Sequence, residues 1–236
     1  MPGTLYLVPN LLGLVSPEQV LPAKTIAVAR RLDHFIVENA KPARAFLASL
    51  DPVRPIREIA ILELGDDPQA GRLMELLAPA RAGHDVGLLS DAGCPGIADP
   101  GAQLVAAAHR TRIAVVPLVG PSSVLLALMA SGMNGQGFTF HGYLPVKTAA
   151  RAQALKSLEA ESQRTGHAQL FIETPYRNEA MLASIVDTCK PSTRLCVAAD
   201  LTLESETVES RALAEWTGRD FAGYAKRPAM FVLQAA

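Results

Sequence analysis

The stretch LLSDAGCPGIADPGAQL, residues 88–104, has the strongest influence on how the rest of the sequence is interpreted. It holds two Asp, three Gly and two Pro, between an apolar run at 85–89 and a helical pattern at 103–109. Asp-Ala-Gly and Asp-Pro-Gly are good turn sequences, so two ordinary turns are one explanation. The other is that the backbone comes close to a bound ligand, because ligands of open α/β sheets bind where buried strands end.

The N-terminal half alternates short apolar runs with helical patterns. Apolar runs predict buried strands over 5–8, 34–37, 85–89 and 113–118. Apolar residues at helical spacing predict helices over 23–32, 42–50, 69–82, 103–109 and 122–129. The segment 59–64 fits a strand or a loop. Apolar strands that alternate with helices are typical of a parallel sheet covered on both faces.

The pattern changes after Gly132, where strands follow one another without a helix each time. Strands are predicted over 138–143, 170–173, 194–199, 206–210 and 230–234, and helices over 148–163 and 179–189. This succession indicates an α+β domain with a mixed sheet. The sequence therefore predicts an α/β protein of two domains, residues 1–119 and 120–236.

Composition excludes several classes of protein. Of the 236 residues, 49% are hydrophobic, and 22 Lys and Arg nearly balance 23 Asp and Glu. A formal charge of −1 gives no whole-protein attraction to nucleic acid, although a local basic patch stays open. The longest nearly apolar run, 124–130, is far below the ~20 residues of a membrane span. The N-terminus lacks the basic start of a signal peptide, so we expect a cytoplasmic protein.

Cysteine and histidine give no metal pattern. The three cysteines form no CxxC pair, and the five histidines show no ligand spacing along the chain. We therefore expect reduced cysteines and no metal.

Four further motifs each have two interpretations. In VGPSSVLLAL, Pro121 and the serines either begin a helix or offer hydroxyls and N–H groups to a ligand. In FIETPYRNEA, either Glu173 and Arg177 form a surface salt bridge, or Glu173, Tyr176 and Arg177 form a site at a strand end. The same alternatives apply to Glu38 and Lys41 of IVENAKPAR. In GYLPVKTAAR, Lys147 and Arg151 are one helical turn apart and form a basic spot or a solvated face.

The order of these motifs across residues 4–234 resembles the tetrapyrrole methylase superfamily, the class III S-adenosylmethionine methyltransferases. Within it, SDAGCPGIADPG, GPSS, GYLPVK and ETPYR are similar to the branch that methylates cytidine 2′-hydroxyls of small-subunit ribosomal RNA. The resemblance implies a cytoplasmic homodimer that binds S-adenosylmethionine in a cleft between its domains, with the loop at 9–13 facing the acceptor. The implied cofactor contacts are Asp91, Ala92, Gly93, Cys94, Ile97, Ser122, Ser123, Val124, Thr174, Pro228 and Ala229.

The implied chemistry adds catalytic candidates. A ribose hydroxyl has a pKa far above 7, so a base or a neighbouring cation helps to remove its proton. Glu38 and Glu173 are the candidate bases, and the candidates to hold phosphate or a developing oxyanion are Lys41, Lys147, Arg151 and Arg177.

Departures from the branch leave the acceptor open. Glu38-Asn39-Ala40-Lys41 stands where the branch has Glu-Asp-Thr-Arg, and Ala198–Thr202 lacks an Arg of the branch. Two alternatives to an RNA acceptor therefore stand. One is a methylase of a tetrapyrrole or another small molecule, and the other is a cofactor-binding protein that has lost catalysis.

Overall fold

The apolar runs of the N-terminal half form a five-stranded sheet in which every pairing is parallel. Its strands are β1 (Thr4–Val8), β2 (His34–Val37), β3 (Ala60–Glu63), β4 (Val86–Leu89) and β5 (Ala114–Pro117). Their order across the sheet is β3-β2-β4-β1-β5. The ambiguous segment 59–64 is therefore a strand, because its backbone completes the edge beside β2.

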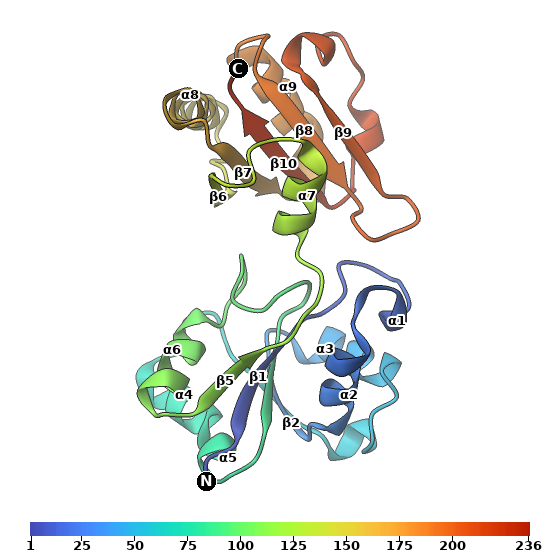
Figure 1. Cartoon of the computed structure of the whole chain (residues 1–236), viewed down its shortest axis with the longest axis vertical. Coiled ribbons are helices and arrows are strands. Elements are labelled where there is room, and N and C mark those ends of the chain that lie inside the picture. Colours follow the sequence, from blue (N-terminus) through green and yellow to red (C-terminus); the bar gives the residue numbers. More distant parts are fainter. The chain divides into compact units, whose positions relative to one another are not determined.

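Helices cover both faces of this sheet, as the apolar strands predict (Figure 1). They are α1 (Pro17–Val20), α2 (Ala23–Arg31), α3 (Ala40–Ser49), α4 (Ala70–Leu76), α5 (Ala78–Arg81) and α6 (Ala102–Arg110). One cluster of buried side chains joins the sheet to α2 and α3, and a second joins it to α4, α5 and α6. Because all five strands run the same way, their carboxyl ends lie along one edge.

The single helix predicted over 69–82 is wrong, since α4 and α5 are separate. Pro79 lies in the first turn of α5. A helix running through from α4 would need an N–H at position 79 that donates to Glu75, and proline has none. Helix α4 therefore ends at Leu76, and α5 begins at Ala78. The four-residue helix α1 is too short to leave a periodic pattern in the sequence.

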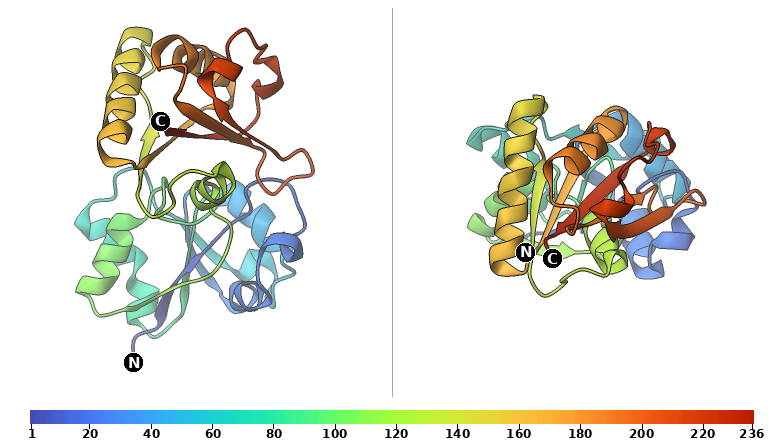
Figure 2. Two further views of the ribbon diagram at one scale, coloured as in Figure 1. Left: turned by 45° about the horizontal axis from the view of Figure 1, so that its top comes forward. Right: turned by 90° about the horizontal axis from the view of Figure 1, so that it is seen from above.

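The second half forms a mixed sheet, as predicted. Its strands are β6 (Phe138–Tyr143), β7 (Ala168–Glu173), β8 (Arg194–Ala199), β9 (Thr207–Ala212) and β10 (Ala229–Gln234), in the order β6-β7-β10-β8-β9. Only β6 and β7 pair in parallel. Helices α8 (Thr148–Thr165) and α9 (Asn178–Thr188) lie side by side against this sheet (Figure 2), and α7 (Ser123–Ser131) contacts β8, β9 and β10.

These coordinates are a computed structural model that describes residues 1–236. The chain divides into an N-terminal unit, Met1–Ser122, and a C-terminal unit, Ser123–Ala236, each with its own sheet and core. None of the helices is long and apolar enough to span a membrane.

The core of the C-terminal unit gives a stability prediction. Phe231 is fully buried and stacks on Phe171 with ring centroids 5.4 Å apart. Truncating it to alanine leaves a cavity that costs about 3–5 kcal/mol. We expect Phe231→Ala to lower the urea midpoint of unfolding, followed by the fluorescence of the single tryptophan, Trp216, which is buried in the same core. Phe138→Ala, at a partly exposed position, should leave the midpoint nearly unchanged.

Candidate functional site

Asn10 joins the loop after β1 to the loop after β4. Its side-chain nitrogen Nδ2 donates to the carbonyl oxygens of Ser90 and Asp91, at 3.0 and 2.9 Å. Its backbone N–H donates to the carbonyl oxygen of Gly93, at 2.8 Å. Asn10 is buried, so these bonds are shielded from water. The glycine-rich loop is therefore fixed to the neighbouring strand end.

The loop after β2 holds the same segment from the other side. Glu38 accepts a hydrogen bond from the backbone N–H of Asp91 on its Oε2, at 3.1 Å. Asn39 donates from Nδ2 to the Oδ2 of Asp91, at 2.6 Å. The Asp91 side chain is thus oriented by an amide donor, and its own backbone is bound by a carboxylate. Three loops that are far apart in the sequence meet at this residue.

Two residues of the glycine-rich loop explain its composition. Gly93 has a φ of +65°, in the left-handed region that side chains disfavour. Cys94 lies beside it, and its thiol donates to the carbonyl oxygen of Pro121, at 3.4 Å. Burial, and then the charge of Asp99, raise the pKa of the Cys94 thiol, so it stays a neutral donor. Cys94 therefore connects the glycine-rich loop to the turn that precedes α7.

Asp99 is a site residue that sequence reasoning treated only as part of a turn. Burial and the nearby charge of Glu38 raise its pKa to about 6, with a smaller contribution from Asp91. Hydrogen bonding with Ser90 opposes part of that rise. Three carboxyl groups therefore share this end of the sheet, and one of them titrates close to neutral pH. The signal in the sequence is faint, because Glu38 comes from a separate stretch of the chain and Asp99 has the Asp-Pro-Gly setting of an ordinary turn.

A pocket of about 340 Å³ opens beside this loop within the N-terminal unit. Residues 10–15 form one wall, one side of α3 forms another, and Asp91 and Ala92 complete it. Most of the lining is apolar, including Leu11, Leu12 and Phe46. The loop at 9–13, predicted to face the acceptor, thus borders a cavity that also touches the predicted cofactor residues Asp91 and Ala92.

In the C-terminal unit, strand pairing brings three predicted cofactor residues together. Ala229 of β10 lies opposite Glu173, the last residue of β7, and Thr174 follows directly. The carbonyl oxygen of Pro228 accepts a hydrogen bond from the backbone N–H of Asp200, at 2.9 Å. Thr174, Pro228 and Ala229 therefore lie at one end of the second sheet.

Glu173 forms the predicted salt bridge with Arg177, but the prediction of a surface pair is wrong, because the Glu173 side chain is buried. Its side chain is fully covered, and its Oε1 accepts hydrogen bonds from Arg177 Nη2 at 2.6 Å and Nε at 2.9 Å. The backbone N–H of Thr174 donates to the same oxygen, at 2.6 Å. The hydrogen bond to Glu173 is the main cause of a raised Arg177 pKa, so the Arg177 guanidinium stays charged. The other carboxylate oxygen, Oε2, is buried without a partner, which is rare unless something else supplies a donor.

The remaining predicted residues lie in several environments. Ile97 is exposed on the glycine-rich loop, Ser122 ends the N-terminal unit, and Ser123 begins α7 with Val124 buried behind it. Lys147 is exposed. Arg151 is not, because it is buried and its Nε donates to Ser184 Oγ at 2.9 Å. Both interpretations of Lys147 and Arg151, a basic spot and a solvated face, are therefore wrong, since Arg151 packs inside the unit.

Known proteins resemble this chain over most of its length. The family of tetrapyrrole (corrin/porphyrin) methylases matches residues 12–216. A protein of Micromonospora olivasterospora named ribosomal RNA small subunit methyltransferase I is 35% identical over 92% of this chain and 65% of its own length. The protein of that name from Escherichia coli O157:H7 is 30% identical over 92% of this chain and 73% of its own length.

Two solved structures share the fold. The methyltransferase CobJ gives a TM-score of 0.65 at 17% identity and covers 99% of this chain and 95% of its own. The uroporphyrin-III-C-methyltransferase of Thermus thermophilus gives a TM-score of 0.58 at 20% identity and covers 99% of this chain and 93% of its own. The chain belongs to the tetrapyrrole methylase family. It spans about two thirds to three quarters of the length of the two ribosomal RNA relatives named above.

Asp99 gives a prediction about pH. Its folded pKa of about 6 lies above the ordinary value of 3.8, so ionisation in the folded state is unfavourable. The loss of folding free energy that this ionisation causes is absent below pH 4 and reaches its full size well above pH 6. We expect the melting temperature of Asp99→Asn to rise relative to that of the unaltered protein as pH increases from 4 to 7. Thermal melts across that range measure it, and a constant difference between the two proteins would contradict the assignment.

Proposed function

We propose that this protein is an S-adenosylmethionine-dependent methyltransferase that methylates a ribose 2′-hydroxyl of small-subunit ribosomal RNA. The observation that carries the proposal is the glycine-rich loop, which Asn10, Glu38 and Asn39 hold at the carboxyl ends of the strands. The names of the relatives from Micromonospora olivasterospora and Escherichia coli support the acceptor.

The residues of each unit suit the chemical groups of this cofactor. In the N-terminal unit, the exposed Asp91 carboxylate takes ribose hydroxyls or an ammonium group, and Gly93 lets the backbone approach closely. In the C-terminal unit, the unpartnered Oε2 of Glu173 needs a donor, which an exocyclic amine supplies, beside Thr174 and Ala229. When bound, S-adenosylmethionine supplies a methyl group already activated by its sulfonium.

The carboxylates take different roles. Glu38 is half-buried and uses only Oε2 for the Asp91 N–H, so its Oε1 is available to accept the proton of the acceptor hydroxyl. Asp99, whose pKa is raised to about 6 by burial and by the charge of Glu38, is the nearby carboxylate that takes this proton on. Glu173 is fully buried and held by Arg177, so it acts as a positioning residue for the turn at Thr174. Lys147 and Arg177 hold acceptor phosphate.

A second candidate is a methylase of a small molecule such as a tetrapyrrole. The largely apolar pocket of about 340 Å³ beside Asp91 favours it, because such walls suit an apolar ligand better than a phosphate backbone. A third candidate is a cofactor-binding protein without catalysis, which the altered Glu38–Lys41 segment favours.

The proposal extends to assembly and location. Leu125 and Met129, one turn apart on α7, are 52% and 79% exposed, and they are the residues through which a second copy would pack to form a homodimer. A ribosomal RNA acceptor places the enzyme with the ribosome, in the cytoplasm.

Cofactor binding is tested at Asp91. A lost charged hydrogen bond of about 1.5–3 kcal/mol corresponds to about 10–100-fold in affinity. We expect Asp91→Asn to weaken S-adenosylmethionine binding by that factor in a calorimetric titration. Its Oδ1 can still accept from Asn39, so the loop should keep its fold. Asp67→Asn, an exposed loop position of the same unit, is the matched control. Equal affinity for Asp91→Asn and the unaltered protein would remove Asp91 from the cofactor site.

The acceptor is tested with a radiolabelled methyl donor. Undermethylated small ribosomal subunits should become labelled at a ribose, in an alkali-stable dinucleotide. Glu38→Gln should lower kcat about 100-fold or more with cofactor affinity retained, since it removes a base. Glu75→Gln, an exposed glutamate on α4, should have no effect. Label in a tetrapyrrole instead would favour the second candidate, and binding without any transfer would favour the third.

A further inference from the structure

We infer that Asp33, His34 and His84 form a second site, which binds a divalent transition-metal ion such as Zn²⁺. One ligand atom from each of these three side chains lies within 4.8 Å of the other two. Asp33 and His34 stand at the start of β2, and His84 stands just before β4. The site is therefore at the amino-terminal edge of the first sheet, opposite the loops described above, and it does not depend on the proposed function.

The backbone already holds these residues in place. The carbonyl oxygen of Asp33 accepts from the N–H of Ala60 at 2.9 Å, and the N–H of His84 donates to the carbonyl oxygen of Pro79 at 3.0 Å. Gly3 passes so close to His84 that a Cβ at position 3 would lie 1.9 Å from the His84 carbonyl oxygen. Only glycine permits that approach, which fixes the segment carrying His84 against the chain entering β1. Metal binding thus requires no movement of the backbone.

The side chains are arranged as in a histidine metal site. Asp33 Oδ1 lies 2.7 Å from His34 Nδ1, so these two donor atoms face one another and can bind one ion that takes the place of the proton between them. The rings of His34 and His84 have centroids 4.9 Å apart. Zinc bonds of about 2.0–2.1 Å in a tetrahedral site put donor atoms about 3.4 Å apart. The three ligand atoms lie within 4.8 Å of one another, and rotation of the exposed His84 side chain brings its nitrogen to the shorter distance. Two imidazoles and a carboxylate suit Zn²⁺, Ni²⁺ or Cu²⁺ better than Mg²⁺ or Ca²⁺.

A nearby arginine opposes the metal. Arg54 Nε lies 3.8 Å from Asp33 Oδ2, and its positive charge repels a cation at the same carboxylate. Its side chain is 59% exposed and contacts Asp33 only at this long distance, so it can turn into solvent when the ion binds. Removing Arg54 should therefore strengthen binding, which distinguishes this site from unspecific binding elsewhere on the surface.

The experiment uses the full chain without an affinity tag. Calorimetric titration with Zn²⁺ should show one saturable site, and Co²⁺ should give d–d absorption bands without a thiolate charge-transfer band. His84→Ala should abolish this binding, and Asp33→Asn should weaken it about 10–100-fold. Arg54→Ala should strengthen it. Zn²⁺ should also raise the melting temperature of the unaltered protein and leave that of His84→Ala unchanged, because binding to the folded state stabilises it.

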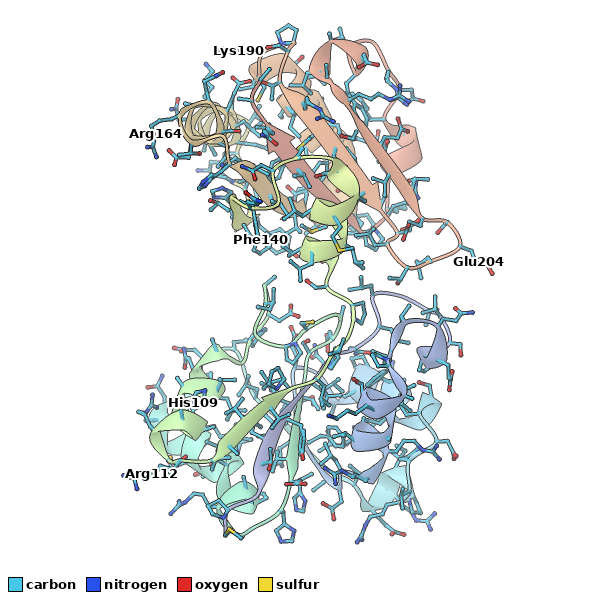
Figure 3. The ribbon with its side chains drawn as sticks, in the orientation of Figure 1. His109, Arg112, Phe140, Arg164, Lys190 and Glu204 are labelled. Carbon is cyan, nitrogen blue, oxygen red and sulfur yellow. The ribbon has the colours of Figure 1, made fainter.

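The matched control is His109→Ala. His109, labelled on α6 in Figure 3, is an exposed histidine of the same unit and should bind no metal with its neighbours. His84→Ala should melt at the same temperature as the unaltered protein in the absence of metal, so a loss of binding cannot be ascribed to unfolding. Absence of a saturable site, equal loss in His109→Ala, or binding that survives both His34→Ala and His84→Ala would overturn the inference.

Discussion

The parallel pairing of β4 with β1 and β2 is the constraint on which both ends of the N-terminal unit depend. Leu7 lies opposite Leu88, and Ile36 lies opposite the same residue on the other side. With the three strands in this register, the segments that follow them leave the sheet together. Asn10, Glu38 and Asp91 are consequently within hydrogen-bonding distance, although more than 25 residues separate each from the next. The same register brings His34 and His84 together where the strands begin.

The hydrogen bonds at the carboxyl ends of β1, β2 and β4 determine which polar groups of the site are already paired. Backbone groups of the glycine-rich loop that face the protein are already paired with Asn10 and Glu38, so the loop does not depend on a ligand to hold its shape. A preorganised loop loses little conformational entropy when it binds, and that favours affinity. The carboxyl group of Asp99 is the exception, because its ionisation near neutral pH adds negative charge to the loop. Glu38 therefore contributes both to the order of the loop and to the charge beside it, whereas the ionisation of Asp99 changes the charge.

Sequence patterns predicted the sheets and most helices because hydrophobic periodicity reports burial on one face at a time. They could not predict the break at Pro79 from periodicity alone, since Leu73, Leu76, Leu77 and Ala80 are buried as one helix would bury them. They also placed Arg151 at the surface, because residue spacing cannot show that its guanidinium donates a hydrogen bond to Ser184 of another helix. The cluster of Asp33, His34 and His84 was missed for a similar reason. Ligand spacing was sought along the chain, whereas the sheet brings the two histidines together from neighbouring strands.

Asn39 shows how one departure from the ribosomal RNA branch alters the site without removing it. The branch has Asp where this chain has Asn39, and an aspartate there would bring a further carboxylate close to Asp91, Glu38 and Asp99. Asn39 instead donates to Asp91 Oδ2 at 2.6 Å, so repulsion is replaced by a hydrogen bond. Lys41 in place of Arg retains a positive charge but loses the planar fork that binds phosphate in two places. The segment thus keeps its hold on the glycine-rich loop, and under the proposed function it would bind an RNA backbone less firmly than the segment of the branch. Of these two departures, Asn39 therefore changes how Asp91 is held, and Lys41 changes a side chain that the proposed function places toward the acceptor.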